Sequence, residues 1–144
     1  MITGINHTGI VVADLEEAIA FYTDVLGLEL VERRERDGGP ISQVLDYQAT
    51  HIKVADVAAP DGRVIELIHY LNPPPADRPT EDRSVLGASH TAFSVDDMAA
   101  TFSRLTDGGA RRRNPPVEGA PGKLVCYLQD PWGNWLEFIQ QASR

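Results

Sequence analysis

The sequence predicts an α+β protein built from two copies of a βαβββ unit, and three observations support this fold class. Short runs rich in β-branched residues accompany one helical pattern in each half of the chain. The phrase that begins at His7 returns at His90, with an offset of 83 residues (90 − 7). The phrase that begins at Pro60 returns at Pro131, with an offset of 71 residues (131 − 60). Two such repeats within 144 residues indicate an internal duplication.

The first copy begins with a strand over residues 5–12, where β-branched side chains dominate. Asp14 is a candidate N-cap, and apolar residues then recur at helical spacing until Gly27 ends the helix. The residues 37–40 predict a turn, and Pro60 begins a second turn. Three further strands are predicted over residues 28–36, 51–57 and 64–70.

The second copy repeats this order, with a strand over residues 90–95 and a helix over residues 97–107. Its last strands are predicted over residues 123–128 and 135–140. We therefore predict a single domain with a first module over residues 1–71, a proline-rich linker over 72–86 and a second module over 87–144.

Charge and composition exclude several classes of partner. Lys and Arg number 13 against 21 Asp and Glu, and the net charge of −8 argues against nucleic acid or an anionic membrane. Cys126 is the single cysteine, so no internal disulfide can form, and a reducing compartment fits. No apolar run approaches the ~18 residues of a membrane span. We expect a cytoplasmic protein that acts on a small molecule.

A histidine and a glutamate recur at matching positions in the two copies. Strand alternation places Glu66 and Glu137 among apolar residues, where an unpaired charge costs several kcal/mol. His7 and His90 occupy equivalent places in the first strand of each copy. Two imidazoles and two carboxylates related by a pseudo-twofold suit a divalent cation. The alternative is an ion-pair network left behind by the duplication.

Three phrases of the chain, residues 7–15, 20–28 and 130–138, resemble the vicinal oxygen chelate superfamily, also called the glyoxalase, bleomycin resistance and extradiol dioxygenase superfamily. The resemblance covers essentially the whole chain. It implies a glyoxalase-like fold in which two βαβββ modules form an open eight-stranded cleft around a metal. It also implies ligands from the first and last strand of each module, which are here His7, Glu66, His90 and Glu137.

The four-ligand pattern is similar to glyoxalase I and to methylmalonyl-CoA epimerase. This resemblance implies a lyase, isomerase or epimerase that removes a proton beside a carbonyl through a metal-bound enediolate. Glu137 is the preferred base, and Glu66 would act on the opposite face. One divalent ion is expected per site, and Ni²⁺, Zn²⁺, Co²⁺, Mn²⁺ and Fe(II) all suit mixed nitrogen and oxygen ligands.

Two departures limit this resemblance. Val11 stands where glyoxalase I carries an arginine for the carboxylate of glutathione. The strand 51–57 lacks the separate glutamate base of the epimerase family.

Two alternatives belong to other function classes. Tyr127 lies ten residues before Glu137, as in the extradiol dioxygenase signature, but residues 118–120 contain no histidine where that signature requires one. A drug-binding or other small-ligand-binding resistance protein would use aromatic side chains as walls. Four aromatic residues are the candidates for binding the substrate: Tyr47, Tyr70, Tyr127 and Trp135.

The open edge of each four-stranded sheet predicts a homodimer. The linker over residues 72–86 is long and stiff enough to let the first module of one chain meet the second module of its partner. The same linker also permits both modules of one chain to close a cleft together. We therefore expect two metal sites per dimer, and of the two routes we favour ligands shared between the chains.

Overall fold

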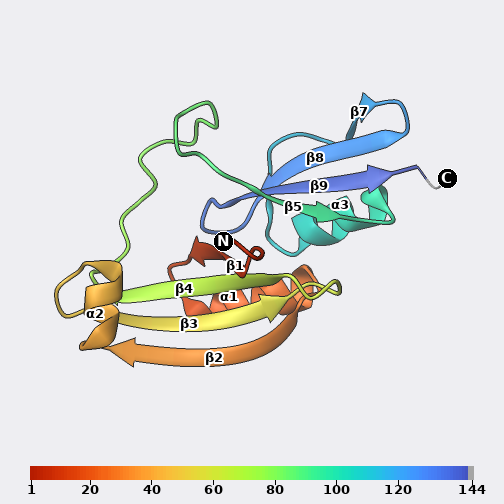
Figure 1. Cartoon of the computed structure of the whole chain (residues 1–144). Coiled ribbons are helices and arrows are strands. Elements are labelled where there is room, and N and C mark those ends of the chain that lie inside the picture. The colour runs from red at the N-terminus through yellow and green to blue at the C-terminus, as the bar shows by residue number, and fades with distance from the viewer. Residues whose placement is uncertain (143–144) are drawn as a thin grey trace. The chain divides into compact units, whose positions relative to one another are not determined.

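The computed structural model describes residues 1–142, and it confirms the α+β class (Figure 1). The chain divides into two compact units, of which the first is Met1–Asp77 and the second begins at Arg78. Each unit contains one mixed sheet and a helix that links its first strand to the strands that follow.

Unit one holds a four-stranded sheet in the order β1-β4-β3-β2. β1 pairs in parallel with β4, whereas β3 pairs antiparallel with both β4 and β2. The first and last strands of the unit therefore lie side by side. Its elements are β1 (His7–Val11), α1 (Leu15–Ala20), η1 (Phe21–Val25), β2 (Glu29–Asp37), α2 (Pro40–Leu45), β3 (His51–Ala58) and β4 (Val64–Asn72).

The predicted N-cap starts the helix of unit one. The side chain of Asp14 accepts a hydrogen bond of 2.9 Å from the backbone N–H of Glu17, which satisfies one of the free donors at the helix start. The helix continues as the π-helical turn η1 and ends at Gly27, whose φ of 83° is a conformation that glycine adopts without strain. Because the crossover between parallel strands must pass over one face of the sheet, this helix covers that face.

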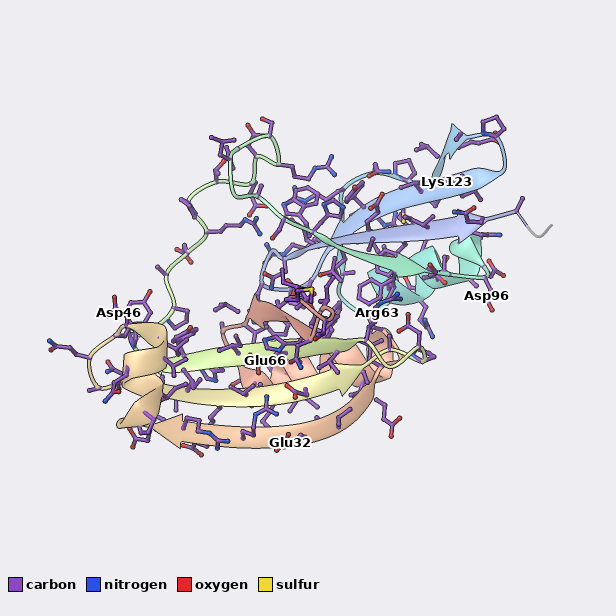
Figure 2. The ribbon with its side chains drawn as sticks, viewed as in Figure 1. Glu32, Asp46, Arg63, Glu66, Asp96 and Lys123 are labelled. Carbon is purple, nitrogen blue, oxygen red and sulfur yellow. The ribbon has the colours of Figure 1, made fainter. Side chains whose placement is uncertain are left out.

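Alternation along β4 separates the core from the opposite face. Ile65 and Leu67 are buried on the helix side, together with Val12 of the segment after β1 and Tyr22 of η1. Glu66 lies between Ile65 and Leu67 in the sequence, so its side chain is on the face away from the helix (Figure 2).

The short helix α2 was not predicted. The residues 37–40 were expected to form a turn, but Pro40 instead opens a helical segment that runs to Leu45. Proline suits this position because its fixed φ matches the first helical turn and its missing N–H has no helical partner there. Gly39 precedes it with a φ of 57°, which allows the change of direction.

Unit two repeats the topology with one difference. β5 pairs in parallel with β9, and β8 pairs antiparallel with β9, in the order β5-β9-β8-β6. Two short strands, β6 and β7, both pair with β8 and together take the place that β2 holds in unit one. The elements are β5 (Thr91–Ser94), α3 (Met98–Asp107), β6 (Arg111–Arg112), β7 (Val117–Ala120), β8 (Lys123–Gln129) and β9 (Trp135–Gln141).

The core of unit two lies between α3 and one face of its sheet. Cys126 and Leu136 are fully buried, and the thiol of Cys126 lies 3.5 Å from the sulfur of Met98 at the start of α3. The neighbours of these residues along each strand, Tyr127 and Glu137, therefore lie on the face opposite α3.

Within residues 1–142, no helix combines the length and the apolar character that crossing a membrane requires.

Replacing Leu67 with Ala is expected to lower the free energy of unfolding by about 2 to 5 kcal/mol, because its fully buried side chain would leave a cavity. Leu86→Ala is the matched control, since Leu86 is fully exposed and the same atoms are removed; its effect should stay within about 0.5 kcal/mol. Urea unfolding of both variants measures the difference. Equal effects would contradict the assignment of Leu67 to the core.

Candidate active site

The parallel pairing of β1 with β4 brings His7 and Glu66 together. Gly9 lies directly beside Glu66, and His7 precedes Gly9 by two residues, so both side chains emerge on the face away from α1. The Nε2 atom of His7 lies 3.6 Å from Oε1 of Glu66. Nδ1 of His7 lies 2.8 Å from the side-chain oxygen of Asn6. If Nδ1 donates in that bond, Nε2 carries the lone pair that faces Glu66.

The parallel pairing of β5 with β9 brings His90 and Glu137 together in the same way. Ala92 lies beside Glu137, as Gly9 lies beside Glu66, and a small residue therefore stands next to each glutamate. Nε2 of His90 lies 3.1 Å from Oε2 of Glu137. The side chain of Glu137 is 15% exposed, whereas that of His90 is 44% exposed.

Both pairs fit a metal by the chemistry of their donor atoms. Two ligands at about 2.1 Å from one ion are separated by roughly 3.0 to 3.4 Å, and the distances of 3.1 and 3.6 Å between imidazole nitrogen and carboxylate oxygen are close to this range. Over residues 1–142, no group of three or more His, Cys, Asp or Glu side chains is gathered for a metal.

Arg34 holds the second oxygen of Glu66. Its Nη2 lies 2.8 Å from Oε2 of Glu66, and its two terminal nitrogens bond both oxygens of Asp56 at 2.7 and 2.8 Å. Nη1 also lies 2.7 Å from a carboxylate oxygen of Glu32. Glu32, Asp56 and Glu66 are cross-strand neighbours on β2, β3 and β4, and Figure 2 labels the two outer members, Glu32 and Glu66. Arg34 is the cation that offsets this row of three carboxylates.

The environment keeps Arg34 charged. The hydrogen bond to Asp56 is the largest effect, and it raises the pKa of Arg34 above the ordinary value of an arginine, while burial acts in the opposite direction. The side chains of Arg34, Asp56 and Glu66 are each 20% exposed. Sequence reasoning missed Arg34, because only the register across the three strands brings it beside Glu66.

Tyr127 occupies the position in unit two that Asp56 occupies in unit one. Tyr127 is the cross-strand neighbour of Glu137 on β8, as Asp56 is the neighbour of Glu66 on β3. Burial is the main effect that raises the pKa of the Tyr127 hydroxyl, and the charge of Glu137 and a hydrogen bond to it raise the pKa further. The hydroxyl also lies 3.5 Å from Nε2 of His90. The two glutamates therefore have different partners.

The four predicted aromatic residues form one pair in each unit. Tyr47 and Tyr70 meet edge to face with ring centroids 6.4 Å apart, and Tyr127 and Trp135 do so at 6.3 Å. Tyr70 follows Glu66 by four residues and shares its face of β4, and Trp135 shares the face of Glu137 on β9. The two remaining histidines are not part of the two His–Glu pairs. His51 contacts Glu35, and His69 lies on β4 beside Lys53 of β3.

The chain belongs to the Glyoxalase/Bleomycin resistance protein/Dioxygenase superfamily, whose pattern it matches over residues 4–138. This match confirms the family that the three sequence phrases indicated, and with it the glyoxalase-like fold.

Relatives of similar length share about a third of their residues with this chain. Lactoylglutathione lyase of Haemophilus influenzae is 31% identical over 141 residues, covering 96% of this chain and 93% of its own. The uncharacterized protein YwbC of Bacillus subtilis is 30% identical over 140 residues, covering 95% and 97%. The lactoylglutathione lyase relatives and the family match confirm the expectation of an enzyme of the glyoxalase type.

Two solved structures have the same fold. A glyoxalase family protein from Bacillus cereus superposes with a TM-score of 0.91 at 28% identity, covering 99% of this chain and 97% of its own. The fosfomycin resistance protein FosX of Listeria monocytogenes, in complex with Mn(II) and sulfate, superposes with a TM-score of 0.65 at 18% identity, covering 100% and 95%.

Replacing Arg34 with Met removes the cation and keeps much of the apolar length of the side chain. Asp56 and Glu66 would lose their shared partner, so the free energy of unfolding of the metal-free protein should fall by about 1 to 3 kcal/mol in a urea titration. Arg33→Met is the matched control, because the ion pair of Arg33 with Glu16 is on the surface and is worth at most about 1 kcal/mol. Similar losses in both variants would show that the carboxylate row does not depend on Arg34.

Proposed function

We propose that this protein is a metal-dependent lyase or isomerase that moves a proton at a carbon beside a carbonyl. The observation that carries the proposal is the matched pair of His and Glu side chains on the first and last strand of each unit. Two imidazoles and two carboxylates at equivalent positions supply the four nitrogen and oxygen donors that a divalent ion prefers.

In this proposal His7, Glu66, His90 and Glu137 together hold one divalent ion. The ion would supply a Lewis acid that polarises the carbonyl oxygen of the substrate. Mn(II) is an ion of suitable size and ligand preference, and it is bound in the FosX complex, which shares this fold. Ni²⁺, Zn²⁺, Co²⁺ and Fe(II) have the same ligand preferences and compete for such a site.

Glu137 is the proposed base, and the different partners of the two glutamates support this choice. Oε2 of Glu66 is held by Arg34, so only Oε1 is available to a ligand. Glu137 has no arginine partner among the described residues, and its neighbour is the hydroxyl of Tyr127. A carboxylate oxygen of Glu137 would take the proton from a hydroxyl-bearing carbon beside the carbonyl and return it to the carbonyl carbon, while the hydroxyl proton would pass to the carbonyl oxygen. The hydroxyl and the carbonyl would thus exchange places, with no net change in the oxidation state of the substrate.

Tyr127 is proposed to orient Glu137. Tyr127 is the cross-strand neighbour of Glu137, and a hydrogen bond from its hydroxyl would fix the rotamer of the carboxylate and leave the other oxygen for proton transfer. The same tyrosine is the observation that favours the runner-up, an extradiol-type dioxygenase, because its hydroxyl is also 3.5 Å from a proposed ligand, Nε2 of His90.

The two reactions differ in what they consume. The protein is loaded anaerobically with Mn(II), Ni²⁺, Co²⁺, Zn²⁺ or Fe(II), and each form is assayed with methylglyoxal thiohemiacetals, acyl-CoA epimers and catechols. In D₂O the proposed reaction exchanges deuterium into the substrate carbon and consumes no oxygen. Oxygen uptake with a catechol would identify the dioxygenase instead. Failure to bind any of these ions would leave the His and Glu pairs as ion pairs.

Glu137→Gln should lower turnover roughly 10² to 10⁴-fold, because the base is lost while an oxygen ligand remains. Metal affinity, measured by competition with a fluorescent chelator, should fall far less than turnover. Glu29→Gln is the control, since Glu29 is an exposed carboxylate at the start of β2 and the charge change is the same. If the Glu137 variant keeps wild-type turnover, Glu137 is a metal ligand only and another residue is the base.

The homodimer with ligands shared between chains remains a prediction. Neither His7→Ala nor His90→Ala alone should bind metal with wild-type affinity. If ligands are shared, a mixed dimer of these two variants contains one complete site, because one site combines both intact halves. Elemental analysis of the mixed dimer should then give one tightly bound ion per two chains. Absence of recovery in a confirmed mixed dimer would indicate that each chain closes its own site.

A further inference from the structure

Arg83 is a cation stacked on the aromatic pair of unit two. Its guanidinium carbon lies 4.2 Å from the ring centroid of Tyr127 and 4.6 Å from that of Trp135. These distances are within the range of a cation–π contact. Arg83 is exposed, so this contact holds the side chain over the rings without removing it from water.

Among the residues that the structure describes, Arg83 has no carboxylate partner, although the chain carries 21 acidic residues against 13 basic ones. Two other arginines of unit two do have hydrogen-bond or ion-pair partners. Arg113 pairs with Glu81 and Gln129, and Arg78 donates to the carbonyl of Gly133. A cation–π contact uses the charge of the guanidinium but none of its five N–H donors, which are therefore available to an acceptor.

The indole of Trp135 supplies a second unused donor. Trp135 is 7% exposed, and its Nε1 is a buried side-chain polar atom for which no hydrogen-bond partner is found in the described residues. A buried N–H without an acceptor destabilises the protein, because it has lost its hydrogen bonds to water. This cost is recovered if a ligand brings an acceptor to the indole.

These donors lie beside the proposed chemistry. Tyr127, on which Arg83 stacks, is the neighbour of Glu137, and its ring centroid is 5.4 Å from that of His90. Trp135 precedes Glu137 by two residues and shares its face of β9. A ligand that contacts Arg83 is therefore next to the His90–Glu137 pair.

We propose that Arg83 and the indole N–H of Trp135 bind an oxyanion of the substrate, a carboxylate or a phosphate-type group. A guanidinium presents two parallel N–H groups that match such an anion, and the rings hold the guanidinium in place. This inference rests on the proposed function and adds the substrate class: a carbonyl compound that also carries an anionic group.

The test uses the metal-free full chain, because phosphate and carboxylates also bind metal ions. The chain has two tryptophans, so Trp132→Phe leaves a single indole N–H signal, that of Trp135, in a ¹H–¹⁵N spectrum. The probes are inorganic phosphate and acetate, titrated at constant ionic strength, with acetamide as the neutral match for acetate. A saturable shift of the indole signal with phosphate, acetate or both, and none with acetamide, is the expected result. Binding of acetate identifies a site for a carboxylate, and binding of phosphate identifies a site for a phosphate-type group.

Arg83→Gln in the same background should weaken anion binding about tenfold or more. Arg83→Lys should weaken it less, because lysine keeps the positive charge but lacks the two parallel N–H groups. Arg104→Gln is the matched control: Arg104 is exposed on α3, which packs on the other face of the sheet, and its loss should leave the affinity unchanged. Circular dichroism checks that each variant is folded.

An indole signal that does not respond to either anion, or an unchanged affinity in Arg83→Gln, would overturn the proposal and leave Arg83 as a structural contact on the rings. If Arg83→Gln does not fold, Arg83→Lys and calorimetric titration of Trp135→Phe, which keeps an aromatic ring and loses the N–H, decide instead. Because no turnover is needed, this result is independent of the lyase assay. Anion binding without proton transfer would refute only the proposed reaction.

Discussion

The parallel pairing of the first strand with the last strand of each unit is the constraint on which the candidate site depends. A hairpin cannot join parallel strands, so the chain must cross one face of the sheet through a helix. That face becomes the core, which buries Leu67 in unit one and Leu136 in unit two. The opposite face then receives the alternate side chains, and a histidine meets a glutamate there only because β1 lies beside β4 and β5 beside β9.

The repeated phrases were enough to predict that His7 and Glu66 have counterparts in His90 and Glu137, because a duplicated unit places equivalent residues in equivalent strands. The expectation that these residues lie on the first and last strand of each unit came from the resemblance to the superfamily. The N-cap Asp14 also follows from local chemistry that the sequence displays directly. Other elements are shorter than the patterns that reveal secondary structure. The helix α2 has six residues and β6 only two, so neither extends over enough periods to be recognised.

The partners of the glutamates were beyond sequence reasoning for a different reason. Arg34 on β2 reaches Glu66 on β4 across the intervening strand β3. Arg83 contacts Tyr127 from a segment without regular secondary structure. Both contacts depend on strand register or on the path of the segment between β4 and β5. Periodicity identifies which face a residue occupies, but it does not say which residue of another strand lies next to it.

The equivalence of Asp56 and Tyr127 bears on how such a protein can diverge. After a duplication both copies begin with the same residue beside the glutamate, and a single substitution in β3 or β8 changes one glutamate's surroundings without touching the other. An acidic neighbour requires a cation such as Arg34, whereas a phenol does not. Two initially identical halves can thus acquire separate tasks one residue at a time, and neither half has to pass through a state in which both carboxylates are disturbed.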